Sequence, residues 1–478
     1  MWGMATTIMR PTIPDWLEEL AQRLAANDPS FTTLEITHQR MDDSMARYLA
    51  QALEENHTVN VFIVSLFSIV DDGALAIAAM LVANKTIEKL QFRDIRNSRE
   101  ATLLFSAIAK SDTIKEFSLR HSYLCAASAA ALSNMILNHP SIQELRLVDT
   151  QLARAGIGTL AEGLAKNKVL NRLYLVNNEL GMSGANDIGL MLRKNKGIQE
   201  IYVCENEIGD EGTYSICQGL INNTSVKIVD FRANDIGTEG ALSISALLNV
   251  SRTIKQLFLG NNDLGDVGAS SIADSLATNN VLEKLNLSDN DISALGTESL
   301  SGMLRTNKGL QELNLAFNHI GDDGATSLAD VLETNTALTL LSIRRNKIGN
   351  IGARSFAKSL PSMRGLKELI MIKNTFGQDG AIKLLSGLRF NLDLEHLQVE
   401  EKCCSPKVLH EMAHWIKLNR AGRKIFRETN LDQGSWSRIL AKSLINRDLD
   451  VLFHFLTEKP DVFQQPKKRK LDESYFRV

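Results

Sequence analysis

Asparagine recurs through the middle of this chain at a fixed interval of 28 residues. The first seven stand in segments that follow the pattern L-x-L-x-x-N-x-I/L, with a glycine at or near a constant offset. Such regularity predicts a stack of near-identical units, each of which buries its apolar face only against its neighbours. The eight asparagines are Asn178, Asn206, Asn234, Asn262, Asn290, Asn318, Asn346 and Asn374.

The same register continues more weakly on both sides of these eight positions. Thr150 and Ser122 take the asparagine position upstream, and Lys402 takes it downstream. Still further upstream the strand pattern persists, but the spacing slips to 27 or 29 residues and the asparagine is lost. We therefore predict about fourteen units, with the repeated position running from Gln39 to Lys402.

Each unit has two halves with different periods. The L-x-L half alternates as a short strand with one buried face does, and the second half spaces its apolar residues as a helix does. Aspartate or threonine often begins the second half, which predicts helix N-caps at Asp210, Thr238, Asp266 and Asp322. A second asparagine near each helix end predicts a left-handed residue at Asn167, Asn195, Asn223, Asn279, Asn307 and Asn335.

Stacking these units predicts an α/β solenoid. The strands line up in parallel on one side and the helices on the other. Because a helix is wider than the spacing between neighbouring strands, the stack must curve into a horseshoe with the sheet on its concave face and the helices on its convex face.

These repeats resemble the leucine-rich repeats of the ribonuclease-inhibitor-like type, which NOD-like receptors and Ran GTPase-activating proteins also carry. The resemblance covers residues 34–402. It implies a horseshoe that binds other proteins on its concave face. It also implies an alternative function, regulation or activation of a small Ran-like GTPase, although those activating proteins have an acidic tail and this chain ends in a basic one.

Composition marks the ends of the solenoid, since all four tryptophans lie outside it and no proline occurs between positions 141 and 360. The chain therefore divides into four parts. We predict an N-terminal capping helix region at 1–33, the solenoid at 34–402, a C-terminal helical cap at 403–460 and a basic disordered tail at 461–478.

The residue between the two leucines of each strand points to the concave face, because the leucines take the buried side. These residues form one row: Arg146, Tyr174, Tyr202, Asp230, Phe258, Asn286, Asn314, Ser342 and Ile370. The two positions after the second leucine extend the surface with Glu205, Arg232, Phe317, Arg344, Arg345 and Lys373.

Aromatic and arginine side chains are the ones that dominate binding energy at protein interfaces. Tyr174, Tyr202 and Phe258 lie on neighbouring or nearly neighbouring predicted strands, among charged residues. We predict that a protein partner binds at Arg146, Arg172, Tyr174, Glu200, Tyr202, Glu205, Asp230, Arg232, Phe258, Phe317, Arg344 and Arg345.

The segment HEMAH at 410–414 matches the H-E-x-x-H pattern of zinc metalloproteases. At 100° per residue, Val408, Met412 and Ile416 share one helix face and the two histidines take the other, which favours an amphipathic capping helix. The third ligand of the extended metzincin pattern is also missing. A zinc metalloprotease and a structural zinc site that adds Cys403 and Cys404 stay as minor alternatives, and we expect neither a metal nor a cofactor.

No other enzyme motif is present: the sequence has no P-loop lysine after glycine, no G-x-S-x-G and no G-x-G-x-x-G. Five cysteines at irregular spacing indicate a reducing compartment, and no apolar stretch predicts a signal peptide or membrane span. With a net charge of −3 we expect neither a nucleic-acid nor a membrane partner. The expected protein is a monomeric, non-enzymatic scaffold in the cytoplasm.

A basic run stands near the C-terminus after Pro466 and consists of Lys467, Lys468, Arg469 and Lys470. Short runs of this kind resemble nuclear localisation signals, which importins bind in extended form. The run therefore raises the nucleus as a second location and an importin as a second partner.

Overall fold

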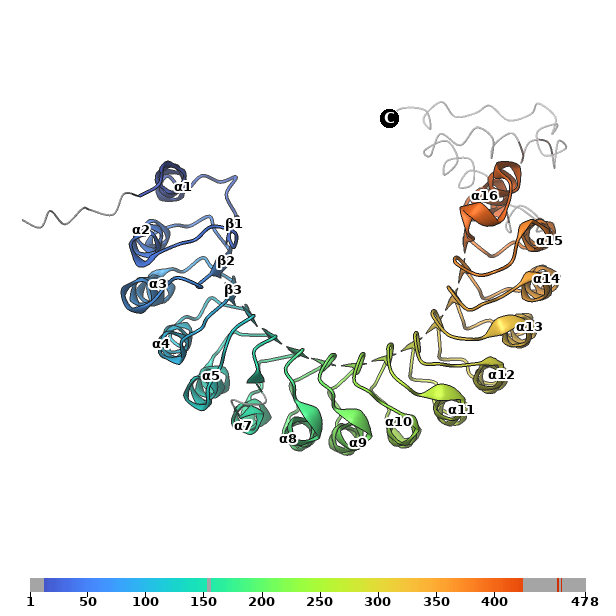
Figure 1. Cartoon of the computed structure of the whole chain (residues 1–478), viewed down its shortest axis with the longest axis horizontal. Coiled ribbons are helices and arrows are strands. Elements are labelled where there is room, and N and C mark those ends of the chain that lie inside the picture. Colours follow the sequence, from blue (N-terminus) through green and yellow to red (C-terminus); the bar gives the residue numbers. More distant parts are fainter. Residues whose placement is uncertain (1–12, 153–155, 424–453, 455–456, 458–478) are drawn as a thin grey trace, which may run out of the picture. The chain divides into compact units, whose positions relative to one another are not determined.

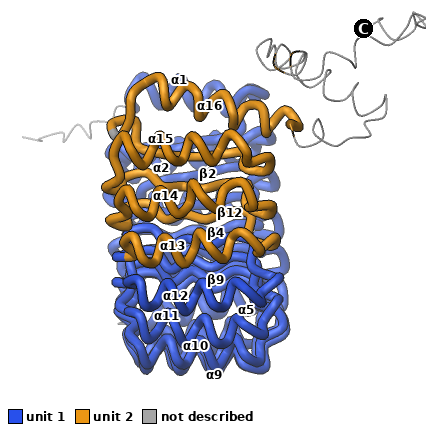
Figure 2. The backbone as a smooth tube through the Cα atoms, turned by 90° about the vertical axis from the view of Figure 1, so that its right-hand side faces the viewer, with its two compact units in different colours: residues 1–319 blue, residues 320–478 orange. Residues whose placement is uncertain are grey.

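The computed structural model describes residues 13–152, 156–423, 454 and 457. Two compact units divide the chain, unit 1 at Met1–His319 and unit 2 at Ile320–Val478 (Figure 2). Each unit repeats one motif, a short strand followed by a helix. Fourteen strands occur in the described residues, which confirms the predicted number of repeats.

The strands of unit 1 form one parallel sheet in which each strand pairs with the next along the chain. They are β1 (Thr33–Ile36), β2 (Val61–Ser65), β3 (Lys89–Arg93), β4 (Glu116–Arg120), β5 (Glu144–Val148), β6 (Arg172–Val176), β7 (Glu200–Tyr202), β8 (Ile228–Asp230), β9 (Gln256–Phe258), β10 (Lys284–Asn286) and β11 (Glu312–Asn314).

The helices of unit 1 lie on the outer side of the curve that these strands line (Figure 1). They are α1 (Asp15–Ala25), α2 (Asp43–Glu54), α3 (Asp71–Ala83), α4 (Ser98–Ile108), α5 (Ala126–Asn138), α7 (Ile157–Lys166), α8 (Gly181–Lys194), α9 (Gly209–Leu220), α10 (Thr238–Val250), α11 (Gly265–Leu276) and α12 (Ala294–Leu304). The predicted α/β solenoid with a concave parallel sheet is thus confirmed for unit 1.

Unit 2 continues the motif with its own parallel strands, in which β13 pairs with β12 and with β14. Its elements are α13 (Gly321–Leu332), β12 (Leu340–Ser342), α14 (Asn350–Ser359), β13 (Glu368–Ile370), α15 (Gln378–Leu388), β14 (His396–Gln398), the 3-10 helix η1 (Glu401–Cys403) and α16 (Pro406–Arg420).

The core of each unit lies between its sheet and its helices, and the alternation of the strands sets which residues enter it. In β6, Leu173 and Leu175 have no exposed surface, whereas Tyr174 between them is half-buried on the concave side. In α13, the residues predicted at helical spacing are all buried: Ala325, Leu328, Ala329 and Leu332. The two periods read from the sequence therefore fix the two faces of the core.

The repeated asparagines form a ladder of hydrogen bonds between successive repeats. Asn234 is fully buried; its Oδ1 accepts a bond from the backbone N–H of Asn206 at 3.0 Å, and its Nδ2 donates to the carbonyl of Val203 at 3.0 Å. Its own N–H donates to Oδ1 of Asn262 at 3.0 Å. Backbone groups that the tight turn would leave without partners are therefore satisfied by the neighbouring coil.

The second asparagine series does not have the left-handed backbone that the sequence predicted. Asn195 is extended, with φ −70° and ψ 135°, and almost fully buried. Its Nδ2 donates to the carbonyl of Leu164 in the preceding repeat, at 2.7 Å, and its Oδ1 accepts from the N–H of Ile198 at 2.8 Å. This series is thus a second ladder, on the helix side, because the amide supplies both a donor and an acceptor where two coils meet.

The left-handed residues instead flank the first ladder. Asn177 and Glu179, on either side of Asn178, have φ of 52° and 53°, and Glu205 and Glu207 repeat the pattern around Asn206. Several turns therefore contain two left-handed non-glycine residues, whereas the turns at Asn261, Phe317 and Lys373 contain one.

The predicted N-caps are also corrected, because the aspartates act on the helix of the next repeat. Asp266 lies in the first turn of α11, and its Oδ1 accepts the N–H groups of Ser293 and Gly296 at 2.8 and 2.9 Å. These two donors are at the start of α12. Asp210 and Asp322 bond the starts of α10 and α14 in the same way, whereas Thr238 is the first residue of α10 and not its cap.

Glycine at the start of the capped helix makes this approach possible. A Cβ on Gly296 would lie 2.6 Å from Oδ1 of Asp266, closer than non-bonded atoms come. A Cβ on Gly240 would lie at the same distance from Oδ1 of Asp210. The fixed glycine of the repeat therefore reflects the contact between neighbouring helices.

A helix lies at the N-terminal end of unit 1 and another near the C-terminal end of the described part of unit 2. α1 packs against α2 in unit 1, and α16 packs against α15 in unit 2. The remainder of the predicted C-terminal cap lies outside the described residues, apart from His454 and Thr457. In the described part of the chain, no helix is long and apolar enough to cross a bilayer.

Replacing Asp266 with alanine is expected to destabilise the protein by about 1 kcal/mol at neutral pH, because two backbone donors of α12 lose their acceptor. Burial alone would raise the pKa of this carboxyl, but the hydrogen bonds from Ser293 and Gly296 outweigh it and hold the pKa below its usual value. The stabilisation is therefore complete above the ordinary aspartate pKa and is lost as the pH falls through the lowered one.

Urea unfolding followed by circular dichroism measures this effect, with Asp274→Ala on the exposed side of the same helix as the matched control. The difference in the free energy of unfolding between the wild type and Asp266→Ala should become smaller at acidic pH. Equal stability of the two alanine variants at neutral pH would contradict the proposed cap.

Candidate functional site

The members of the predicted concave row from Arg146 to Asn314 lie on adjacent strands of unit 1, whereas Ser342 and Ile370 belong to unit 2. Parallel pairing places Arg146 of β5 opposite Tyr174 of β6, and Tyr174 opposite Tyr202 of β7. The row continues through Asp230 to Phe258 on the next two strands. Because neighbouring strands lie about 4.8 Å apart, successive side chains of the row are in contact distance.

Three of these side chains form a continuous stack. The rings of Tyr174 and Tyr202 are nearly parallel, at an interplanar angle of 5° and a centroid distance of 4.2 Å. The guanidinium of Arg146 lies over the other face of Tyr174, 3.9 Å from the ring centroid. We refer to Arg146, Tyr174 and Tyr202 as the aromatic stack.

Carboxylates on the same face hold the aromatic stack in place. Glu144 is 3% exposed and forms ion pairs with Arg146 and with Arg172, the latter at 2.7 Å. The phenol of Tyr202 donates a hydrogen bond to Glu200 at 3.0 Å. The predicted residues Arg146, Arg172, Tyr174, Glu200 and Tyr202 are therefore one connected group.

The two phenols of the stack stay neutral over the physiological range. Burial raises the pKa of Tyr174 above its ordinary value. Burial also raises the pKa of Tyr202, and the hydrogen bond to the Glu200 carboxylate adds to this effect, because ionisation would place two negative charges together. A partner would therefore contact the uncharged rings of the two tyrosines and the Arg146 guanidinium, which Glu144 holds in place.

Asp230 differs from the prediction, which required an exposed carboxylate: its side chain is fully buried. The carboxylate accepts from the backbone N–H of Arg232 at 3.0 Å and from its guanidinium at 2.6 Å. Arg232 itself is about half exposed, and its guanidinium lies 5.9 Å from the ring centroid of the half-buried Phe258. Asp230 therefore orients Arg232, which is the residue that a partner could contact.

The remaining predicted contacts lie outside the stack. Glu205 and Phe317 are exposed residues of unit 1 in left-handed turns, with φ of 59° each, so they stand beyond the strands rather than on them. Arg345, at φ 55°, takes the same turn position in unit 2, next to the half-buried Arg344. Neither arginine of unit 2 can be assigned to the surface of unit 1.

Sequence reasoning missed two arginines at the third concave position of their strands, Arg93 of β3 and Arg120 of β4. They are directly opposite each other in the parallel register. The predicted concave row begins at Arg146 of β5, so it includes no residue of β3 or β4. The sequence does contain the strand pattern that would identify them, because each arginine directly follows two alternate apolar residues, L-x-F before Arg93 and F-x-L before Arg120.

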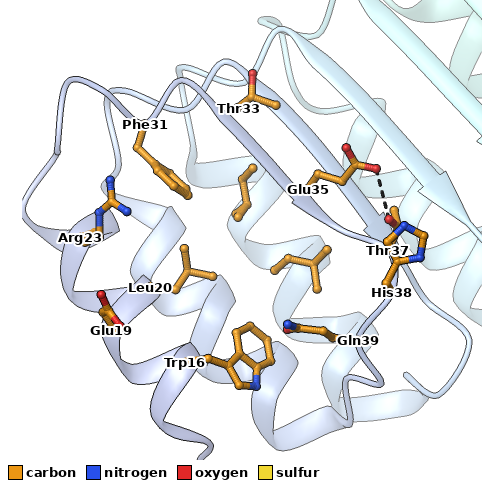
Figure 3. A pocket seen from close by; sticks show the side chains of 12 residues that line it. Trp16, Glu19, Leu20, Arg23, Phe31, Thr33, Glu35, Thr37, His38 and Gln39 are labelled. Atoms are coloured by element: carbon orange, nitrogen blue, oxygen red, sulfur yellow. Dashed lines mark hydrogen bonds between the residues drawn. The ribbon is translucent and has the colours of Figure 1, made fainter.

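A hollow of about 640 Å³ lies at the start of unit 1, between α1 and the edge strand β1 (Figure 3). Trp16 and Leu20 of α1 line it, together with Phe31, over which the Arg23 guanidinium lies at 4.8 Å from the ring centroid. Glu35 and Thr37 are hydrogen-bonded to each other at 3.1 Å. The lining is mainly the junction of the capping helix with the first repeat.

The HEMAH segment lies in α16, where Val408, Met412 and Ile416 are buried as the amphipathic pattern predicts. Its glutamate, Glu411, is paired with Arg389 at 2.6 Å, and His414 packs edge-on against Trp415. The described residues contain no group of three His, Cys, Asp or Glu side chains placed to hold a metal ion. The side chain of Cys403 and the basic run Lys467–Lys470 lie outside the described part of the chain.

A comparison with protein-family models agrees with this architecture. The family model described as "Leucine Rich repeat" matches residues 222–245, 250–273, 278–301, 306–329 and 334–357. None of the curated proteins compared with the chain matches it. Among solved structures, "Leiomodin-1 Actin-Binding Site 2 (ABS2)" is similar at 16% identity and a TM-score of 0.29, covering 39% of this chain and 91% of that one, a likeness too weak to support any argument.

One cysteine of unit 1 has an unusual environment. Cys125 is half-buried at the N-cap of α5, where it forms a capping box with Ser128: its side chain accepts from the backbone N–H of Ser128, and the Ser128 hydroxyl accepts from the backbone N–H of Cys125 at 2.9 Å. Hydrogen bonds from the Ser128 backbone and the Ser98 side chain lower the pKa of its thiol to about 7. By contrast, burial raises the pKa of Cys204 to about 11 and that of Cys217 to about 12.

Cys125 should therefore react with iodoacetamide at pH 7 well before Cys204 or Cys217, because the thiolate is the nucleophile. Peptide mapping by mass spectrometry measures the three rates in one sample. The rate at Cys125 should reach half of its maximum near pH 7 and level off above about pH 8, where most of the thiol is ionised. A rate that still climbs steadily above pH 8 would show that the thiol has an ordinary pKa.

Proposed function

We propose that this chain, in which five segments between residues 222 and 357 match the leucine-rich repeat family model, acts as a non-enzymatic scaffold that binds a protein partner on the concave face of unit 1. The observation that carries the proposal is the aromatic stack. It presents two tyrosine rings and an arginine on adjacent strands, and these are the residue types that contribute most to binding at protein interfaces.

The order of the stack favours binding over a purely structural role. Its three side chains are already held by the parallel ring contact, by Glu144 and by Glu200. Side chains that are fixed before association lose little conformational entropy when a partner arrives. A flat surface of this kind therefore supplies affinity at a low ordering cost.

Arg172, Arg232 and Phe258 would extend the contact on both sides of the stack. Arg232 keeps about half of its side chain exposed while Asp230 neutralises and orients it. Charged groups at the margin of an interface mainly direct the approach of a partner and select against wrong ones. Regulation of a Ran-like GTPase stays an alternative drawn from the sequence resemblance, and no contact in the described residues favours it.

We also propose, from the sequence alone, that Lys467–Lys470 serve as a nuclear localisation signal bound by an importin. The protein would then be found in both the cytoplasm and the nucleus. The proposal rests on the basic run after Pro466.

Tyr202→Ala is expected to weaken binding of a partner recovered by affinity purification by about 2 kcal/mol, roughly thirtyfold in Kd, because it removes half of the ring pair. Tyr214→Ala is the matched control, since Tyr214 is 55% exposed on α9 of the same repeat but on the convex side. Isothermal titration calorimetry gives the affinities, and circular dichroism shows that both variants remain folded.

Tyr202→Phe separates the ring from its hydroxyl group. It keeps the stacked ring and loses only the hydrogen bond to Glu200, so its affinity should lie close to that of the wild type. An affinity that is unchanged in Tyr202→Ala, or lowered equally by Tyr214→Ala, would exclude the stack as the binding surface.

For the basic run, Lys468→Ala with Arg469→Ala should lower the nuclear-to-cytoplasmic ratio of a fluorescently tagged protein, because an importin would lose two of its four cationic contacts. Arg193→Ala with Lys194→Ala removes the same charge from exposed positions in α8 and should leave the ratio unchanged. Identical distributions of all three forms would exclude the signal.

A further inference from the structure

Three arginines gather on the concave face just upstream of the tyrosine pair. Arg93 of β3 is directly opposite Arg120 of β4. Arg146 of β5 is opposite Ser118, which is two residues before Arg120 on the same face of β4. We refer to Arg93, Arg120 and Arg146 as the basic cluster.

The acidic residues near the basic cluster are already paired with other cations. Glu116 is ion-paired with Lys89 at 3.0 Å, and the buried Glu144 is shared between Arg146 and Arg172. No ion pair of Arg93 or Arg120 occurs among the described residues. Lys89, Arg172 and the three arginines of the basic cluster carry five positive charges, against two negative charges on Glu116 and Glu144, so this group of residues keeps an excess of three positive charges.

The excess of positive charge causes repulsion between neighbouring guanidinium groups. Burial lowers the pKa of Arg120 from its ordinary value, and the neighbouring positive charges of Arg93 and Arg146 lower it further. The guanidinium remains charged at physiological pH, because the ordinary pKa of arginine lies above 12. Like charges brought together in this way are relieved by a bound anion.

A hollow in the sheet surface lies at the same place. It has a volume of about 260 Å³, and Arg120, Arg146, Lys89 and Ser118 are among the residues that line it. The hydroxyl of Ser118 has no hydrogen-bond partner in the described structure, although the residue is only 8% exposed. The Nε atoms of Arg93 and Arg120 are likewise buried without a partner. Buried donors normally have acceptors, so these groups indicate a missing ligand.

We propose that the basic cluster binds a run of acidic side chains in the protein partner, an inference that rests on the proposed function of the same concave face. Carboxylates suit the site because arginine presents paired N–H groups that match a carboxylate in two-point contact. The Ser118 hydroxyl would donate a further hydrogen bond to one of the acidic groups.

The extent of the basic cluster favours several carboxylates over one compact phosphate. Its arginines come from three adjacent strands, so their backbones span about 10 Å. A single phosphoryl group could contact only part of such a row, whereas successive acidic residues of one segment could each meet a different arginine.

The position of the aromatic stack adds an apolar requirement to the partner. From β3 to β7 there are four strand spacings, about 19 Å, which corresponds to about six residues of extended chain. A partner segment that crosses the strands would thus place acidic residues over β3–β5 and an apolar or aromatic residue against Tyr174 and Tyr202. We expect the partner motif to be a short acidic run adjacent to an apolar residue.

Selection of peptides from a randomised display library against the full chain tests this motif directly. Recovered peptides should be rich in Asp and Glu next to an apolar residue, and their affinity should fall as the salt concentration rises. Arg93→Gln with Arg120→Gln should weaken these peptides at least tenfold, because two of the three arginines are lost. The matched control, Arg193→Gln with Lys194→Gln, removes equal charge from α8 and should leave the affinity unchanged.

The possible results separate this inference from the proposed function. The library could yield neutral or basic peptides that bind Tyr202→Ala more weakly but bind Arg93→Gln/Arg120→Gln as well as the wild type. This result would overturn the acidic motif and would still support binding on the concave face. If the affinity of no recovered peptide depends on the basic cluster or on the aromatic stack, both the acidic motif and the concave binding face are overturned. Replacing the acidic residues of a recovered peptide by phosphoserine, or titrating oligouridylate RNA, should not give tighter binding; a gain of tenfold or more with either probe would overturn the carboxylate assignment.

Discussion

The hydrogen bonds between successive repeats are the constraint on which the rest of the molecule depends. Each coil has turns whose backbone groups cannot be satisfied within the coil itself, and the buried amides of Asn234 and Asn195 satisfy them with the neighbouring coil. Because an unpaired buried polar group costs about 1–3 kcal/mol, one coil cannot shift relative to the next without losing several such bonds. The register of the stack is therefore fixed at every repeat.

Because the register is fixed, residues that recur every 28 positions along the chain form a continuous row across the sheet. Residues 28 positions apart, such as Arg146, Tyr174 and Tyr202, become direct neighbours on adjacent strands. Their contacts are thus as well defined as contacts within one element, although the chain between them forms a whole helix. The aromatic stack and the basic cluster both arise in this way. The concave face of unit 1 is therefore basic across β3–β5 and aromatic across β6 and β7.

Several sequence-based interpretations failed for a common reason, which is that a side chain was assigned to its own repeat. Asp266 was expected to cap α11 and instead caps the start of α12. Asn195 was expected to end its helix in a left-handed conformation and instead bonds the preceding coil. In each case the partner of the side chain comes from the close approach of neighbouring coils or strands, which local propensity does not describe.

The sequence by itself determined the period, the two faces of each strand and helix, and the row to which Tyr174 and Tyr202 belong, because these follow from spacing alone. Only the tertiary structure decided which members of that row are exposed, how Glu144 is shared between two arginines, and that Arg93 and Arg120 stand side by side with no ion pair to a carboxylate of the described residues. Burial and ion pairing depend on distances between side chains of adjacent coils, and those distances exist only after the coils have stacked.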